Sequence, residues 1–168
     1  VARGAQLVSS SIQDPRGIEV RAERRQVDVP AGVRYGDVAV ALQAQGLALA
    51  NLASLPHISV GGAIATGTHG SGLLNGSLAT QVSGLELIDG TGETVTLTRG
   101  STDFPGAVVA LGLLGVVTRV VLDVEPSFDV AQSVYRDLPL ASLLENFDEL
   151  SGLGYSVSVF TTWASPDV

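Results

Sequence analysis

The residue types best suited to chemistry are concentrated in residues 54–72, which read SLPHISVGGAIATGTHGSG. Closely spaced glycines let the backbone approach a ligand and direct several N–H groups at one point. The pair Gly61-Gly62 could open a short helix over Ala63-Ile64-Ala65, and the N-terminus of a helix favours a phosphate. Hydroxyl groups in the same stretch add hydrogen-bond donors, and they belong to Ser54, Ser59, Thr66, Thr68 and Ser71.

These features predict a cradle for a neutral or anionic ligand, such as a pyrophosphate or the edge of a flavin ring. An ordered glycine-rich loop without a ligand is the alternative. The stretch is not a Walker A loop, because no Gly-Lys-Ser/Thr follows, and it lacks the strand–GxGxxG–helix unit of a Rossmann fingerprint. His57 and His69 have neither a Cys nor a nearby carboxylate as partner, so no nucleophile–base pair is predicted. His69 is expected either to face a ligand or to bond to its own loop, and His57 to be structural.

Composition excludes several other functions. With no Cys and two His, the chain has too few ligands for a zinc site, and no metal is expected. Nine basic and 17 acidic residues give a net charge of -8, which disfavours binding to nucleic acid or to an anionic membrane. The basic group Arg21, Arg24 and Arg25 is interrupted by acids and is interpreted as a solvated strand face. No apolar run approaches the roughly 18 residues of a membrane span, and no signal peptide is recognised, so a cytoplasmic location is expected.

The elements that must position the stretch follow from hydrophobic periodicity. A strand is predicted over 24–33 with a hairpin partner at 18–20, then a helix over 35–45 and irregular chain over 51–77. Strands at 81–88 and 93–98 form a hairpin around Asp89-Gly90-Thr91-Gly92, before a helix at 103–114 and a buried strand at 116–124. Beyond Pro126 a strand at 133–138, a helix at 139–150 and a strand at 155–160 are expected. The predicted fold class is α+β, since no βαβ rhythm is sustained.

Two longer runs carry a resemblance to a known family. Ala53–Gly62 and Ala65–Gly72 together resemble the second half of the FAD-binding domain of the vanillyl-alcohol oxidase / p-cresol methylhydroxylase (PCMH) superfamily. Gly-Thr-His-Gly is shared with aldonolactone oxidases, whereas the longer run from Leu47 to Ser59 resembles alditol (xylitol) oxidases. Further similar stretches are Val33–Tyr35, Asn75–Ala79, Leu113–Thr118 and Tyr155–Phe160 with Trp163. The resemblance covers nearly all of the chain past about residue 18.

The resemblance implies a division of the chain and a set of site residues. Residues 1–125 would be part of a PCMH-type FAD-binding domain, and residues 126–168 the truncated beginning of a substrate domain. Ser54 would lie near the flavin ring and face the alditol hydroxyls, as the one catalytic residue. The implied FAD contacts are Ser54, Ser59, Gly62, Thr66, Gly67, Thr68, His69 and Val117.

The implied activity is that of an oxidase that converts a terminal hydroxyl of an alditol, such as xylitol or sorbitol, with O2 into an aldose and hydrogen peroxide. An aldonolactone oxidase or dehydrogenase and a non-catalytic flavin-binding module are the alternatives. The family's Gly-x-Gly-His-Ser loop, whose His bonds to the flavin, has no counterpart here, and its later catalytic groups are also missing. The chain is therefore expected to be an inactive fragment, an expectation that the late strand at 155–160 supports because it lacks partners. The oligomeric state is left open.

Overall fold

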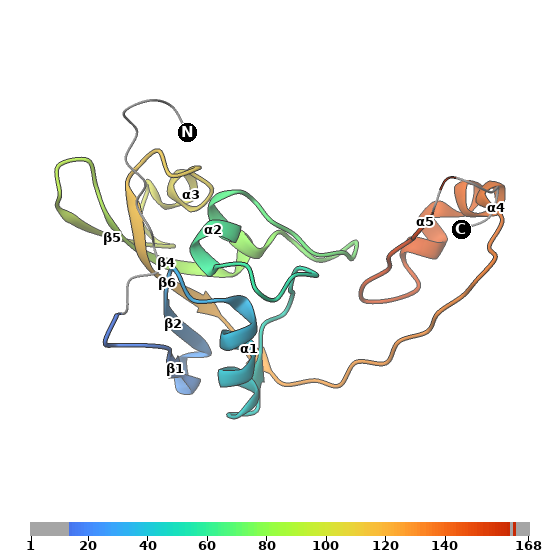
Figure 1. The fold of residues 1–168 in the computed structure, drawn as a ribbon, viewed down its shortest axis with the longest axis horizontal. Coiled ribbons are helices and arrows are strands. Elements are labelled where there is room, and N and C mark those ends of the chain that lie inside the picture. The colour runs from blue at the N-terminus through green and yellow to red at the C-terminus, as the bar shows by residue number, and fades with distance from the viewer. Residues whose placement is uncertain (1–13, 162, 164–168) are drawn as a thin grey trace.

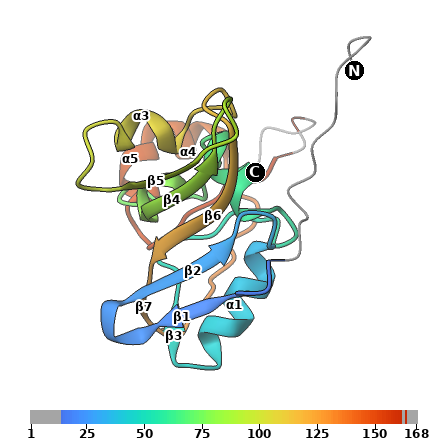
Figure 2. The ribbon, with the colours of Figure 1, turned by 90° about the vertical axis from the view of Figure 1, so that its left-hand side faces the viewer.

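The computed structural model describes residues 14–161 and 163, and its main element is a five-stranded antiparallel sheet (Figure 1). Figure 2 shows the strands side by side in the order β1-β2-β6-β4-β5, with β6 at the centre. A separate two-stranded pair joins β3 to β7. The strands are β1 (Glu19–Arg21), β2 (Gln26–Pro30), β3 (Leu47–Ala48), β4 (Val82–Ile88), β5 (Thr94–Thr98), β6 (Val116–Asp123) and β7 (Glu125–Pro126).

One face of the sheet carries the hydrophobic core. Alternating residues of β2 and β6 point to this face, so Val27 lies opposite Leu122 and Val29 opposite Val120, all four fully buried. Three helices contribute to the same core: α1 (Tyr35–Gln43), α2 (Val60–Ala65) and α3 (Phe104–Val108). Figure 1 shows α1 and α2 on the same side of the sheet. The core therefore holds α2, and with it the glycine-rich stretch, against the centre of the sheet.

The opposite face of the sheet carries an ionic network centred on Arg119 of β6. Its guanidinium donates from Nε to Asp28 Oδ1 at 2.8 Å and from one terminal nitrogen to Asp14 Oδ2 at 2.8 Å. The other terminal nitrogen donates to the backbone oxygens of Gly17 and Asp28, each at 3.2 Å. These partners satisfy a side chain that is only 2% exposed, as a buried charge requires. Arg21, predicted as part of a solvated strand face, also pairs with Asp28, at 2.6 Å.

Up to β6 the predicted elements occur in the predicted order, but β3 and α2 occur in addition and one helix is shorter than expected. The hairpins β1–β2 and β4–β5 form, and β6 covers most of the strand predicted at 116–124. The helix predicted over 103–114 is wrong beyond Val108. Leu111, Gly112 and Gly115 adopt positive φ angles of 51°, 77° and 141°, which a right-handed helix cannot contain. The freed segment forms a loop whose Leu111 N–H donates to Ala65 O at 3.2 Å.

The chain beyond β7 departs further from the prediction. Neither predicted strand, 133–138 or 155–160, forms, because no described strand pairs with either segment. The helix predicted over 139–150 is divided into α4 (Leu140–Glu145) and α5 (Phe147–Ser151). Asn146 makes the break, since its side chain bonds back to Ser142 O at 2.9 Å. Figure 1 shows a long extended connection between β7 and these two helices.

Within residues 14–161 and 163, no helix combines the length and the apolar character that crossing a membrane requires. The same described residues contain no group of three or more His, Cys, Asp or Glu side chains placed to hold a metal ion.

Candidate functional site

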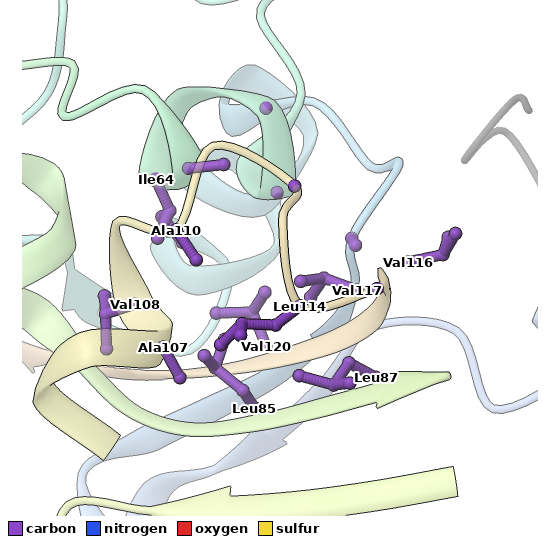
Figure 3. Close-up of a pocket in the computed structure, with 16 residues that line it drawn as sticks. Ile64, Leu85, Leu87, Ala107, Val108, Ala110, Leu114, Val116, Val117 and Val120 are labelled. Atoms are coloured by element: carbon purple, nitrogen blue, oxygen red, sulfur yellow. The ribbon is translucent and has the colours of Figure 1, made fainter. Parts of the chain in front are cut away.

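A pocket of about 150 Å³ lies where α2 and the loop after α3 meet strands β4 and β6 (Figure 3). Every residue that lines it is aliphatic or glycine. Leu85 comes from β4, Val117 and Val120 come from β6, and Leu114 closes the pocket from the loop. An uncharged wall of this kind suits a flat or apolar group, with polar atoms of the ligand directed to the pocket's edges.

Glycines form the edge of the pocket on two sides. Gly61 and Gly62 approach from α2, and Gly112 and Gly115 from the loop before β6. Gly115 has a φ of 141°, and a Cβ there would fall on the backbone oxygen of Ile88. A Cβ on Gly61 would come within 2.8 Å of Ala31 Cβ. Larger residues at these two positions would push apart the segments that form the pocket.

Two of the first amides of α2 are not available for the phosphate that the sequence suggested. The N–H of Val60 donates to Val33 O at 2.9 Å, and that of Gly61 donates to Ala31 O at 2.8 Å. These bonds anchor the helix to the end of β2, and they leave those two amides without capacity for an anion. With six residues, α2 also has only a small dipole. The glycines of α2 let its backbone come close to a ligand in the pocket, whereas the amides of Val60 and Gly61 serve to hold the helix in place.

Hydroxyl groups gather at the C-terminal end of α2. Thr66 follows the helix, and its Oγ1 donates to Gly62 O at 3.0 Å. Thr68 Oγ1 lies 3.3 Å from Thr66 Oγ1, while Gly67 between them turns the chain with a φ of 68°. Each hydroxyl oxygen keeps acceptor capacity, so the pair can bond to a polar ligand group that reaches this end of α2.

The two remaining polar site residues lie on exposed loops. His69 bonds through Nδ1 to its own neighbour, Gly70 O, at 2.9 Å, and its backbone bridges to Ser77. Of the two interpretations of His69, the one in which the side chain bonds to its own loop is therefore observed for Nδ1. Ser54 is exposed on the loop that leads into α2. The two loops touch, since a Cβ on Gly70 would lie 2.5 Å from Leu52 O.

The predicted site residues thus fall into two groups. Gly62 and Val117 line the pocket, and Ser59, which precedes α2, lies close to Gly62, whose added Cβ would be 2.8 Å from Ser59 Oγ. The other predicted site residues do not line the pocket, and they are Ser54, Thr66, Gly67, Thr68 and His69. The sequence reasoning missed the lining residues Leu85 and Leu87 of β4, and also Gly112 and Gly115. Only the two glycines carried a signal, which is their spacing just before a valine-rich strand.

The family of the chain follows from comparison with known proteins. Residues 6–98 match the model of the FAD binding domain family, and the chain belongs to that family. Membership confirms the predicted superfamily and the predicted cofactor, FAD.

Individual relatives are flavin-family oxidases. The chain is 49% identical over 152 residues to an alditol oxidase of Streptomyces sp. (strain IKD472 / FERM P-14339), a match that covers 90% of the chain and 36% of the relative. It is 36% identical over 135 residues to L-gulonolactone oxidase of Bos taurus, covering 79% of the chain and 30% of that enzyme. A D-arabinono-1,4-lactone oxidase of Eremothecium gossypii is 37% identical over 126 residues, covering 74% and 24%. The chain therefore spans 36% or less of the length of these three relatives.

Proposed function

We propose that the chain is part of an FAD-dependent alditol oxidase, which converts a terminal hydroxyl of a polyol such as xylitol or sorbitol, with O2, into an aldose and hydrogen peroxide. The observation that carries this proposal is the 49% identity to an alditol oxidase across 90% of the chain. Residues 1–125 would form the FAD-binding part, and residues 126–168 would begin the substrate domain. The end of β7 at Pro126 and the extended connection after it support that boundary.

The pocket fits one part of the cofactor. FAD, when bound, accepts a hydride from the substrate carbon and passes the electrons to O2. A volume of about 150 Å³ is too small for the whole dinucleotide, so the pocket would hold only part of FAD. The apolar walls at Val117 and Leu85 suit a flat ring face. The hydroxyls of Thr66 and Thr68, which are not among the lining residues, suit polar atoms elsewhere on the cofactor. Other parts of FAD would need groups outside the pocket.

The described residues supply binding and orientation, and not proton transfer. Ser54, exposed on the loop before α2, is the hydroxyl that we assign to the alditol chain. Within residues 14–161 no hydrogen bond or ion pair joins a histidine to a carboxylate, the arrangement that would activate a substrate hydroxyl. We therefore expect the general base to lie outside the described chain, and the 168-residue chain alone to be inactive.

Aldonolactone oxidation is the second candidate function. It is favoured by the 36% identity to L-gulonolactone oxidase over 79% of the chain. The pocket would serve that reaction equally well, because it is assigned to the cofactor that both reactions use. A third candidate is a flavin-binding module without catalysis, which the lining of the pocket by aliphatic residues and glycines alone favours.

A substrate comparison separates these candidates. The longer protein that the proposal requires would be purified with FAD and assayed for hydrogen peroxide with xylitol, sorbitol and L-gulono-1,4-lactone under air. Faster peroxide formation with the two alditols supports the proposal, and preference for the lactone would overturn it. Flavin binding without peroxide from any of the three would favour the non-catalytic module.

A further inference from the structure

The segment after α5 returns to the glycine-rich stretch and contacts it through several polar groups. In Figure 1 this segment, coloured red, bends close to the tip of the green loop that follows α2. The hydroxyl of Tyr155 donates to Ala50 O at 2.6 Å. Ser156 Oγ is hydrogen bonded to Ser71 Oγ, and Ser158 Oγ lies 3.4 Å from the same atom. Three polar contacts, from Tyr155, Ser156 and Ser158, thus join segments far apart in the sequence.

Asn75 and Gly72 allow the segment after α5 to come close to the glycine-rich stretch and hold it there. The side-chain nitrogen of Asn75 donates to Ser71 O at 3.0 Å and to Tyr155 O at 3.2 Å, which holds both segments at once. Gly72 has a φ of 117°, and a Cβ there would fall on Tyr155 O and on the Asn75 amide. Only glycine therefore allows the Tyr155 backbone to come this close.

The contacts reach the two loops that carry the exposed site residues. Ala50 leads into the loop of Ser54, and Ser71 follows His69. Residues 51–58 form no helix or strand, so their position depends on contacts with other segments. Asn51 already bonds to Gly76 O at 3.1 Å, which ties the two loops to each other. Tyr155 and Ser156 tie both loops to the chain beyond β7.

We propose that residues 155–158, here called the clamp segment, fix the loops of Ser54 and His69 in place, and that Tyr155 is a positioning residue for oxidation of the substrate. The inference rests on the proposed function for its catalytic consequence. Its structural part, that the clamp segment orders residues 50–54 and 69–76, holds independently. The α2 pocket is anchored through Ala31 and Val33 instead, so loss of the clamp leaves that pocket intact.

The first test uses hydrogen exchange in the 168-residue chain, which requires no turnover. Tyr155→Phe removes the bond to Ala50 O, and Gly72→Ala pushes the clamp segment away. We expect exchange in residues 50–54 and 69–76 to rise severalfold in both variants. Matched controls are Tyr135→Phe, at a ring that is 83% exposed, and Gly90→Ala, where a Cβ meets open space. Exchange at wild-type rates in Tyr155→Phe would overturn the proposal, even if Gly72→Ala failed to fold.

The second test uses the longer, FAD-loaded protein with xylitol. Misplacement of a substrate-facing group by about 1 Å can cost up to 100-fold in rate, so we expect kcat/KM of Tyr155→Phe to fall about tenfold or more. FAD affinity should fall much less than kcat/KM, because the pocket at Gly62 and Val117 is retained, whereas a general loss of structure would lower both. Unchanged kcat/KM would overturn the positioning role. A wild-type protein without alditol activity would reject the proposed function and leave the exchange result as the test of the clamp.

Discussion

Arg119 and Asp28 form a buried ion pair on the face of the sheet opposite the hydrophobic core, with Arg119 Nε 2.8 Å from Asp28 Oδ1. Their side chains are only 2% and 12% exposed. The pair links β6 to β2, two strands that are far apart in the sequence and adjacent in the sheet. Asp14 adds a third member and attaches the chain before β1 to the same face. The sheet therefore depends on charge as well as on its apolar core.

Removal of the arginine is expected to be strongly destabilising. Arg119→Ala leaves Asp28 with Arg21 as its remaining ionic partner, so we expect a loss toward the lower end of the range of about 3–5 kcal/mol that breaking a buried pair costs. Arg99→Ala is the matched control, because its pair with Asp123 is 53% and 40% exposed and should contribute at most about 1 kcal/mol. Urea unfolding followed by circular dichroism measures both. Equal losses in the two variants would contradict a special role for the buried pair.

Acid is expected to weaken the fold through the same network. Hydrogen bonds from Arg16 and then Arg119 hold the pKa of Asp14 well below its usual range, and a hydrogen bond from Arg16 lowers the pKa of Glu86. The unfolded chain therefore binds protons at a higher pH than the folded chain does. The stabilisation is fully present above the unfolded pKa values, near 4, and is lost as the pH falls through the lower, folded values.

The pH dependence can be assigned with one variant. Urea midpoints measured from pH 7 to pH 3 should fall below about pH 5 in the wild type. Glu86→Gln, which cannot titrate, should show a shallower decline over the same range. A decline as steep as that of the wild type would place the acid sensitivity elsewhere.

A single methyl group at the pocket edge is expected to weaken flavin binding. In Gly62→Ala the new Cβ would lie 2.8 Å from Ser59 Oγ, a hydroxyl that can rotate away, so the fold should survive. We expect about tenfold weaker FAD binding, or about 1.4 kcal/mol, measured by quenching of flavin fluorescence. Gly106→Ala in α3, where a Cβ meets open space, is the control. FAD affinity equal to wild type in Gly62→Ala would show that the pocket edge at Gly62 does not contact FAD.

Gly115 is expected to tolerate no side chain. Gly115→Ala combines a φ of 141° with a collision against the Ile88 carbonyl, so we expect a loss of roughly 2–5 kcal/mol in the free energy of unfolding. Gly100→Ala, at an open turn position, should change stability by less than about 1 kcal/mol. Thermal unfolding of the two variants tests this difference. Similar melting temperatures would show that the loop before β6 adapts.

Local sequence signals predicted the elements that depend on local contacts. The β4–β5 hairpin follows from a turn at Asp89-Gly90-Thr91-Gly92 between two alternating strands, and both strands form as expected. The strand expected at 155–160 had the right alternation, but no described strand pairs with it. Alternation describes which way side chains face, and a strand also needs a neighbour to accept its backbone hydrogen bonds.

The candidate site also combines residues that the sequence could predict with residues that only the packing of distant segments brings together. Family resemblance placed Gly62 and Val117, and both line one pocket. Leu85 and Leu87 could not be predicted as lining residues, because a leucine in β4 is simply a core residue until β6 and the loop after α3 pack beside it. The burial of Arg119 was equally hidden, since its partner Asp28 precedes it by 91 positions.

The central place of β6 has a consequence for how the sheet is assembled. β1–β2 and β4–β5 are hairpins that can form from neighbouring residues, but they share no edge until β6 is inserted between β2 and β4. Closing a long loop costs entropy before the contacts it allows are made, so joining the two hairpins should be the slow step of folding. During synthesis the chain would carry two unjoined half-sheets with open edges until residue 123 emerges, the interval in which it is most exposed to aggregation.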